Sequence, residues 1–336
     1  MKKFLSIVLV ALMVLSFTAC TQKPAAKPED KPATPEPAVT LDYPKRAIEI
    51  IVPFGPGGSA DIMTRQVASL MGNYVDKPVN VVNKAGGGGV DGMVYVSQAE
   101  ADGYTILQIT PSHAIAEAIG RPNASLSTEF EPIANFQKDM QVFGVKKDSP
   151  FNTIDELIEF AKANPGKLKI GGTSPGGLDD YMANGFAKAA GIEFTYVPYN
   201  SAAETKAAAL GGEIDIYQDK VISFLTMVKA GDIRPLVVLN DVRLDMIEEL
   251  KDTPCSVEKG IDFTQGSWRG FAVKKGTPQE IKDYLTDVIE QVYNSAEYKE
   301  AAAKDMSDIL PGYIGQKEYG DMWITEIAKF KQILVK

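Results

Sequence analysis

Short runs of β-branched residues alternate with helical patterns along most of this chain, and this alternation constrains the fold more than any other feature. The runs predict strands at Ile48–Val52, Val79–Val82, Thr105–Ile109, Val142–Val145, Lys169–Ile170, Phe194–Val197, Ile214–Tyr217 and Leu236–Leu239. Helical patterns separate them, among them Ala60–Tyr74, Ile154–Ala163, Leu178–Ala190, Ala203–Leu210 and Val221–Ala230. Strands that alternate with helices in this way are typical of an α/β fold.

The N-terminus has the pattern of an export signal. Two lysines precede an uncharged apolar run from Phe4 to Ala19, which is shorter than the roughly 20 residues that a helix needs to cross a bilayer. The run ends in Ser-Phe-Thr-Ala-Cys, which resembles a bacterial lipobox. We therefore predict a signal peptide over residues 1–19 and lipidation of Cys20. An ordinary signal peptide that happens to contain a cysteine is the alternative.

The next segment is predicted to be a tether. Residues 21–40 mix proline with lysine and glutamate and have almost no apolar bulk, so burial cannot offset the entropy of ordering them. The rest of the 336-residue chain is long enough for two lobes. We place lobe 1 at residues 43–145 plus 267–336 and lobe 2 at residues 146–266, with the lipidated cysteine and tether at residues 20–42.

The composition argues against several classes of protein. The chain has one histidine and two cysteines, of which Cys20 is assigned to the lipid. Cys255 would then have no partner for an intramolecular disulfide, and a zinc or copper site of His and Cys ligands is disfavoured. The net charge of −9 argues against nucleic acid. It also provides no basic field, so an anionic ligand would have to be held locally.

The first loop of chemical interest joins a predicted strand to a helix. It contains Gly55, Gly57 and Gly58, followed by Ser59 and Asp61. Glycines let the backbone approach a ligand closely, and the free N–H groups at a helix start attract anions. No Gly-Lys-Ser/Thr follows, so the loop is not a P-loop. Ser59 and Asp61 are predicted ligand contacts; the alternative for both is that they only cap the helix.

Three more loops follow strands in the same way. The second contains Ala85, Gly86 and Gly87, the third runs from Thr110 through Ser112 to His113, and the fourth contains Ser174 and Gly176. Ligands of α/β proteins bind beyond the carboxyl ends of the strands. We therefore expect these loops to face one another across a cleft. Any single glycine loop is also an ordinary turn of an α/β protein.

An ordered set of motifs resembles the substrate-binding receptors of tripartite tricarboxylate transporters, the Bug receptors. The motifs are Tyr43-Pro44, Ile51–Asp61, Asn83–Gly88, Asp102–Thr105, Val197-Pro198-Tyr199, Leu210–Asp215 and Gly276-Thr277-Pro278. The resemblance implies a two-lobed periplasmic-binding-protein fold (type II, Venus flytrap) with two chain crossings. It also implies that lobe 1 holds a ligand carboxylate through backbone amides, hydroxyls and bridging waters. By this carry-over, the residues near the ligand are Phe54, Ser59, Ala85, Gly86, Thr110, Ser112, Ser174 and Asp219.

The chain departs from the family at two places. Asn200-Ser201-Ala202 stands where the family usually has Lys-Gly-Gly, and Arg269 stands where an aromatic or apolar residue is commoner. Arg269 could pair with a second carboxylate or be a solvated hinge residue. Asp219 could accept from a ligand hydroxyl or amine, or cap the helix from Val221. His113 is a candidate ligand contact, although most lone loop histidines have structural roles.

The predicted function is capture of a small organic carboxylate for a membrane transporter with a large and a small subunit. Dicarboxylates, tricarboxylates, acidic amino acids and aromatic acids all remain open as ligands. The protein would be lipid-anchored, face the periplasm or the cell exterior, and need no cofactor or metal. A receptor that signals to a membrane histidine kinase is the alternative. A hydrolase with His113 as base and Ser112 or Ser174 as nucleophile is a minor alternative, because no Gly-x-Ser-x-Gly motif is present.

Overall fold

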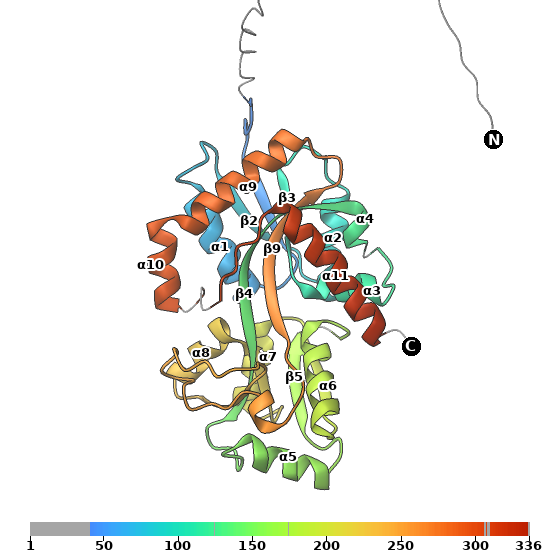
Figure 1. Cartoon of the computed structure of the whole chain (residues 1–336), viewed down its shortest axis with the longest axis vertical. Helices are drawn as coiled ribbons and strands as arrows, with labels where there is room; N and C mark the ends of the chain where they lie inside the picture. Colours follow the sequence, from blue (N-terminus) through green and yellow to red (C-terminus); the bar gives the residue numbers. More distant parts are fainter. Residues whose placement is uncertain (1–40, 124, 174, 306, 308–309, 335–336) are drawn as a thin grey trace, which may run out of the picture. The chain divides into compact units, whose positions relative to one another are not determined.

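The computed structural model describes residues 41–336 except 124, 174, 306, 308–309 and 335–336 (Figure 1). The predicted signal peptide, the predicted tether and Cys20 lie outside the described residues, as does Ser174. The stretch from Leu41 onward forms one compact unit. Within its described part, no helix has the length and apolar character needed to cross a membrane.

The described residues contain nine strands in two sheets. The strands are β1 (Ile48–Val52), β2 (Val79–Asn83), β3 (Thr105–Ile109), β4 (Phe130–Lys146), β5 (Lys169–Thr173), β6 (Thr195–Tyr199), β7 (Tyr217–Lys220), β8 (Ile233–Val238) and β9 (Gly266–Lys274). The larger sheet has the order β2-β1-β3-β9-β4-β7, with β8 also on β4, and β5 pairs with β6 in parallel. Because β1 is parallel to both β2 and β3, their carboxyl ends meet at one edge.

Strands β4 and β9 carry the chain between the two groups of strands (Figure 1). Over residues 130–140, β4 pairs antiparallel with β9; from Gln141 onward it pairs instead with β7 and β8. Along its other edge, strand β9 pairs antiparallel with β3. These two long strands are the two crossings that the sequence predicts. Prediction found only the end of β4, because its first part lacks a continuous β-branched run.

Helices cover the sheets (Figure 1). The described helices are α1 (Ser59–Met71), α2 (Val90–Ser97), α3 (Pro111–Ala118), α4 (Leu126–Glu129), α5 (Ile154–Ala163), α6 (Leu178–Ala190), α7 (Ala202–Gly211), α8 (Val221–Lys229), α9 (Gln279–Asn294), α10 (Ala296–Asp305) and α11 (Gln316–Leu334). Short 3₁₀ turns lie at Gly87–Gly89 and Val257–Lys259.

The cores form where amphipathic helices pack on these strands. One cluster joins Ile50 of β1, Val67 of α1 and Val288 of α9. A second cluster lies around Val142 of β4 and Phe224 of α8. Burial of such side chains stabilises a fold by roughly 25 cal/mol for each Å² removed from water.

One predicted strand was wrong in its position. Ile214 and Ile216 alternate with exposed residues and therefore resemble a strand, but strand β7 begins only at Tyr217. The preceding residues bond instead to β5, where Asp215 and Ile216 donate their backbone N–H groups to the carbonyl of Lys169. As a result Asp219 lies inside strand β7 rather than after it.

Candidate ligand-binding site

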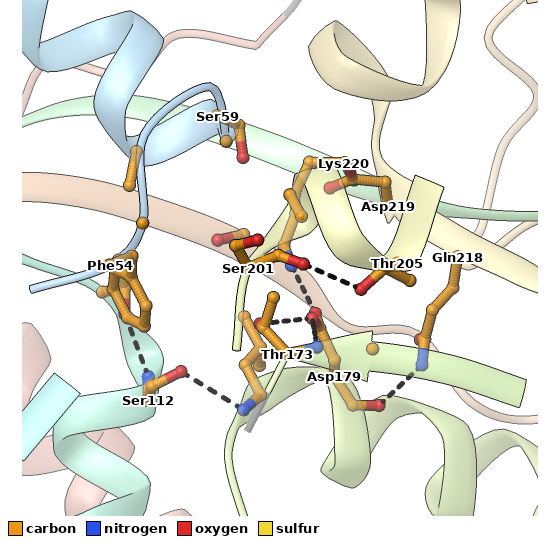
Figure 2. A pocket seen from close by; sticks show the side chains of 18 of the residues that line it. Phe54, Ser59, Ser112, Thr173, Asp179, Ser201, Thr205, Gln218, Asp219 and Lys220 are labelled. Atoms are coloured by element: carbon orange, nitrogen blue, oxygen red, sulfur yellow. Dashed lines mark hydrogen bonds and ion pairs between the residues drawn. The ribbon is translucent and has the colours of Figure 1, made fainter. Parts of the chain in front are cut away.

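Loops from both groups of strands enclose one pocket with an empty volume of about 670 Å³ (Figure 2). Its lining combines the starts of α1, α3, α6, α7 and α8 with side chains of β7 and β9. The polar and charged residues in the lining are Ser59, Thr110, Ser112, Thr173, Asp179, Asn200, Ser201, Thr205, Gln218, Asp219, Lys220, Ser267 and Arg269. Phe54 adds an aromatic surface.

We call Ser59, Thr110 and Ser112 the hydroxyl wall. Ser59 is the first residue of α1, and this helix start has no side-chain cap, because Gly58 occupies the N-cap position. The first N–H groups of a helix have no partner within it and together carry a partial positive charge. The hydroxyl wall is therefore neutral, yet it favours an anion.

Asp61 lies behind this wall and does not line the pocket. Its carboxylate accepts from the backbone N–H of Gly57 at 3.0 Å and from Asn83 at 2.9 Å, and it pairs with Arg65 at 2.9 Å. Burial alone would raise the pKa of Asp61, but the hydrogen bonds from Arg65, Gly57 and Asn83 lower it below the ordinary value. Asp61 therefore stabilises the first glycine loop through its bond with Gly57.

Helix α3 begins with a capping box that the sequence analysis did not predict. The hydroxyl of Thr110 accepts from the N–H of Ser112 at 3.3 Å, while Nδ1 of His113 accepts from the N–H of Thr110 at 3.0 Å. His113 is fully buried and outside the pocket lining. Burial lowers the pKa of His113 to about 4, although hydrogen bonds with the Thr110 and Gly89 backbones oppose this effect.

The second glycine loop faces a neighbouring cavity. Ala85, Gly86 and Gly87 line this larger space, whose empty volume is about 1560 Å³ and which shares Phe54 and Asn200 with the first pocket. Gly86 has φ 151°, and a Cβ there would lie 1.9 Å from Oδ2 of Asp91. Only glycine fits at this position.

The third and fourth loops meet directly. The Ser112 hydroxyl accepts from the backbone N–H of Leu178, at the start of α6, at 3.2 Å. Arg121 donates to the carbonyls of Gly87 at 2.6 Å and Pro175 at 2.9 Å, which joins the second loop to the fourth. Gly176 lines a separate surface hollow beside α6 and α11 rather than the pocket.

We call Asp179, Asp219 and Lys220 the charged wall (Figure 2). Lys220 forms an ion pair with Asp179, whose other oxygen accepts from the N–H of Thr173 at 2.9 Å. Burial would raise the pKa of Asp179, but Lys220 and Thr173 lower it. Asp219 accepts from the hydroxyls of Tyr217 and Ser223 and from the N–H of Lys220.

Arg269 joins the crossing strands to the hydroxyl wall. Its side chain is 1% exposed and donates to Gln137 at 2.6 Å, to Asp139 at 3.2 Å and to the Ser59 hydroxyl at 2.7 Å. Burial raises the pKa of Asp139, an effect that Arg269 opposes. The side chain is buried in the pocket lining, so the alternative of a solvated hinge residue is wrong.

The pocket therefore brings together only part of the predicted set. Phe54, Ser59, Thr110, Ser112 and Asp219 line it; the other described members lie behind it or in neighbouring cavities. Asp179, Lys220 and Thr173 were not predicted. Their one sequence signal was weak, since Asp179 lies in the first turn of a predicted helix, where acidic residues are common.

The site has the chemistry of a binding pocket for a small anion. Within the described part of the chain, no group of three His, Cys, Asp or Glu side chains could hold a metal ion. The pocket instead presents backbone amides at helix starts, hydroxyl groups and paired charges to a ligand. It lies in a fold whose chain crosses twice between the two groups of strands. Such a pocket in an α/β fold with two crossings defines the class of periplasmic solute-binding proteins.

Comparisons with known proteins identify the family within this class. Residues 63–336 match the tripartite tricarboxylate transporter family receptor, and the chain belongs to this family. A UPF0065 protein encoded in the gbd 5′ region of Cupriavidus necator is 29% identical over 312 residues, which cover 90% of this chain and 91% of the relative. The predictions of the family and of its solute-binding function are thereby confirmed.

Solved structures agree with this assignment. A periplasmic transporter is 29% identical with a TM-score of 0.80, and the match covers 88% of this chain and 98% of the other. Rpa4515 of R. palustris, determined with adipate, is 24% identical with a TM-score of 0.80 and coverage of 87% and 97%. The predicted periplasmic-binding-protein fold is confirmed.

Proposed function

We propose that the pocket captures a small organic carboxylate outside the cytoplasmic membrane and that the closed receptor delivers it to a large and a small membrane subunit. The observation that carries this proposal is the start of α1, which lines the pocket without a side-chain cap. A ligand carboxylate would supply the missing acceptors. The adipate in Rpa4515 supports a carboxylate as the ligand.

Arg269 prepares the hydroxyl wall for an anion. Because its guanidinium already donates to the oxygen of Ser59, the hydrogen of that hydroxyl is left to donate to the ligand. The three bonds from Arg269 to Gln137, Asp139 and Ser59 use three of the five N–H donors that a guanidinium carries. We infer that Arg269 orients Ser59 and adds positive potential to the carboxylate site.

We further propose that closure of two lobes traps the ligand, with lobe 1 at residues 43–145 plus 267–336 and lobe 2 at residues 146–266. The supporting contacts are those of Ser112 with Leu178 and of Arg121 with Pro175. The proposed lobes also approach each other closely at Gly55, where an added Cβ would lie 2.9 Å from Cβ of Ser201. Such closure would give the membrane subunits a signal that the ligand is bound.

Anchoring is proposed to follow from the N-terminal segment, with a lipid on Cys20 and residues 20–42 as the tether. We also propose that the protein binds without turnover. His113, the candidate base of a hydrolase, is fully buried outside the pocket lining, and the Ser112 hydroxyl accepts from the N–H of Leu178. This arrangement does not activate a serine nucleophile.

A thermal-shift screen of the chain from residue 21 onward tests the proposal. The panel contains organic acids, sugars and nucleotides, and a ligand that binds the folded state raises the melting temperature by mass action. We expect stabilisation by carboxylates alone. Stabilisation by sugars or nucleotides, without any by carboxylates, would overturn the proposed function.

A further inference from the structure

We propose that the ligand of this receptor carries an ammonium group as well as a carboxylate, as an amino acid does, and that Asp219 accepts the ammonium group. The inference rests on the proposed function, since it takes the pocket to be the carboxylate site. It adds the chemical class of the ligand and assigns the two ends of that ligand to the two walls.

The first argument is the pairing of the buried charges. Asp179 has Lys220 as its cationic partner, and Asp139 has Arg269. Asp219 is also buried, with 7% of its surface exposed, but only neutral groups donate to it. No side-chain nitrogen of a described Lys or Arg lies within 4.0 Å of its carboxylate. A buried carboxylate without a cation is costly unless a ligand supplies one.

The second argument is that Asp219 does not cap helix α8. The sequence analysis left open whether it caps this helix. In the structure the N–H of Val221 donates to Asp139 at 3.1 Å, and the N-cap residue Lys220 forms no side-chain cap. Asp219 accepts instead from the Ser223 side chain. Capping therefore does not explain a carboxylate at this position.

The third argument concerns formal charge. The three carboxylates of Asp139, Asp179 and Asp219 face the two cations of Lys220 and Arg269, an excess of one negative charge. A dicarboxylate would raise that excess to three within a largely buried site. An amino acid with a neutral side chain would leave it at one, with its positive end available to Asp219. Charge repulsion at low dielectric therefore favours the zwitterion.

The geometry suits this assignment. Ser59 and Asp219 line the same pocket from different elements, the start of α1 and strand β7 (Figure 2). Three hydrogen bonds from Tyr217, Ser223 and the Lys220 backbone fix the Asp219 carboxylate. A carboxylate has about four acceptor positions, so these bonds leave one for a ligand N–H. A group held in this way needs little reorganisation on binding.

Matched pairs of ligands test the proposal by calorimetry. Each pair differs by the ammonium group alone, as glutamate and glutarate, alanine and propanoate, or valine and 3-methylbutanoate do. We expect the ammonium-bearing member of the best-binding pair to bind at least about tenfold tighter, which corresponds to about 1.4 kcal/mol. Equal or tighter binding of the member without the ammonium group would overturn the inference while leaving the proposed carboxylate function intact.

The variant Asp219→Asn provides a second test, because misfolding would weaken binding of both members of a pair and would not change the preference between them alone. It should reduce the preference within a pair to less than about threefold, because the charge that attracts the ammonium group is gone. It should also bind the member without the ammonium group at least as tightly as the wild type does, since a repulsive carboxylate is removed. Asp215→Asn makes the same charge change at an exposed position four residues earlier in the chain and should keep the preference.

Two results, one with the variant and one with the wild type, would overturn the inference. One is an Asp219→Asn protein that binds and keeps the wild-type preference. The other is a wild type that binds only compounds with two carboxylates and no ammonium group. If no compound with a carboxylate binds at all, the proposed function itself fails, and this outcome is distinct from both.

Discussion

The hydroxyl wall and the charged wall of the pocket differ in the chemistry of their side chains. The hydroxyl wall consists of short neutral side chains at helix starts, whereas the charged wall consists of charged side chains from the start of α6 and from strand β7. Lys220 and Asp179 are 41 residues apart, and none of the hydroxyl-wall residues carries a charge. We infer that the first wall holds the carboxylate that all ligands share, while the second determines which carboxylate is accepted.

The largest expected effect comes from blocking the hydroxyl wall. Ser59→Leu places an apolar side chain against Arg269 and removes the hydroxyl that faces the ligand. We expect no measurable binding of any carboxylate by calorimetry. Ser69→Leu is the matched control, because it makes the same substitution at an exposed position of the same helix. Full affinity in a folded Ser59→Leu protein would remove this wall from the site.

Within the charged wall, the ion pair of Lys220 with Asp179 is expected to stabilise the fold. Lys220→Met leaves Asp179 buried without its cation, and loss of one partner of a buried ion pair typically costs about 3–5 kcal/mol. The pKa of Asp179 should then rise, since Lys220 no longer lowers it. Urea unfolding measures the loss. The double variant Lys220→Met/Asp179→Asn should recover most of it; an equal loss in both proteins would show that the charges do not matter.

Sequence and structure agree where the determinants are local. The hydroxyl wall was predictable, because each of its residues lies where a predicted strand gives way through a short loop to a helix. The predicted bounds of β1, β3, α5 and α6 also match the structure. The charged wall was not predictable from pattern. Its ion pair joins Lys220 of β7 to Asp179 of α6, 41 residues apart. The contact that Arg269 makes with Ser59 of the hydroxyl wall spans 210 residues. Local periodicity contains no information about such pairing.

A titration can test whether the hydroxyl wall stays neutral. His113 lies directly behind it with a pKa of about 4, below the ordinary value of 6.5, because burial disfavours the charged form. The unfolded chain therefore binds a proton first as the pH falls. This contribution to stability is complete above about pH 6.5 and is lost towards pH 4, a change of about 3 kcal/mol.

The variant His113→Asn isolates this effect from the carboxylates that titrate nearby. Its free energy of unfolding should fall less than that of the wild type between pH 6.5 and 4, and the difference between the two proteins is the histidine contribution. Parallel stability curves would show that His113 is not kept neutral by burial. The wall in front of it would then lie next to a positive charge at low pH, and the contrast between the walls would narrow.

The smallest effect is expected where the two halves are joined at the surface. Arg121 donates to Gly87 and Pro175, and an exposed hydrogen bond contributes about 1 kcal/mol or less. Arg121→Ala should therefore weaken ligand binding about fivefold, because the closed state loses a contact that the open state does not make. Calorimetry measures the affinity, and small-angle scattering should show a more open average conformation.

Arg243→Ala, which breaks a surface ion pair with Glu258 away from both cavities, is the control. If Arg121→Ala binds as tightly as this control, the two walls are brought together by the ligand itself rather than by the protein surface around it.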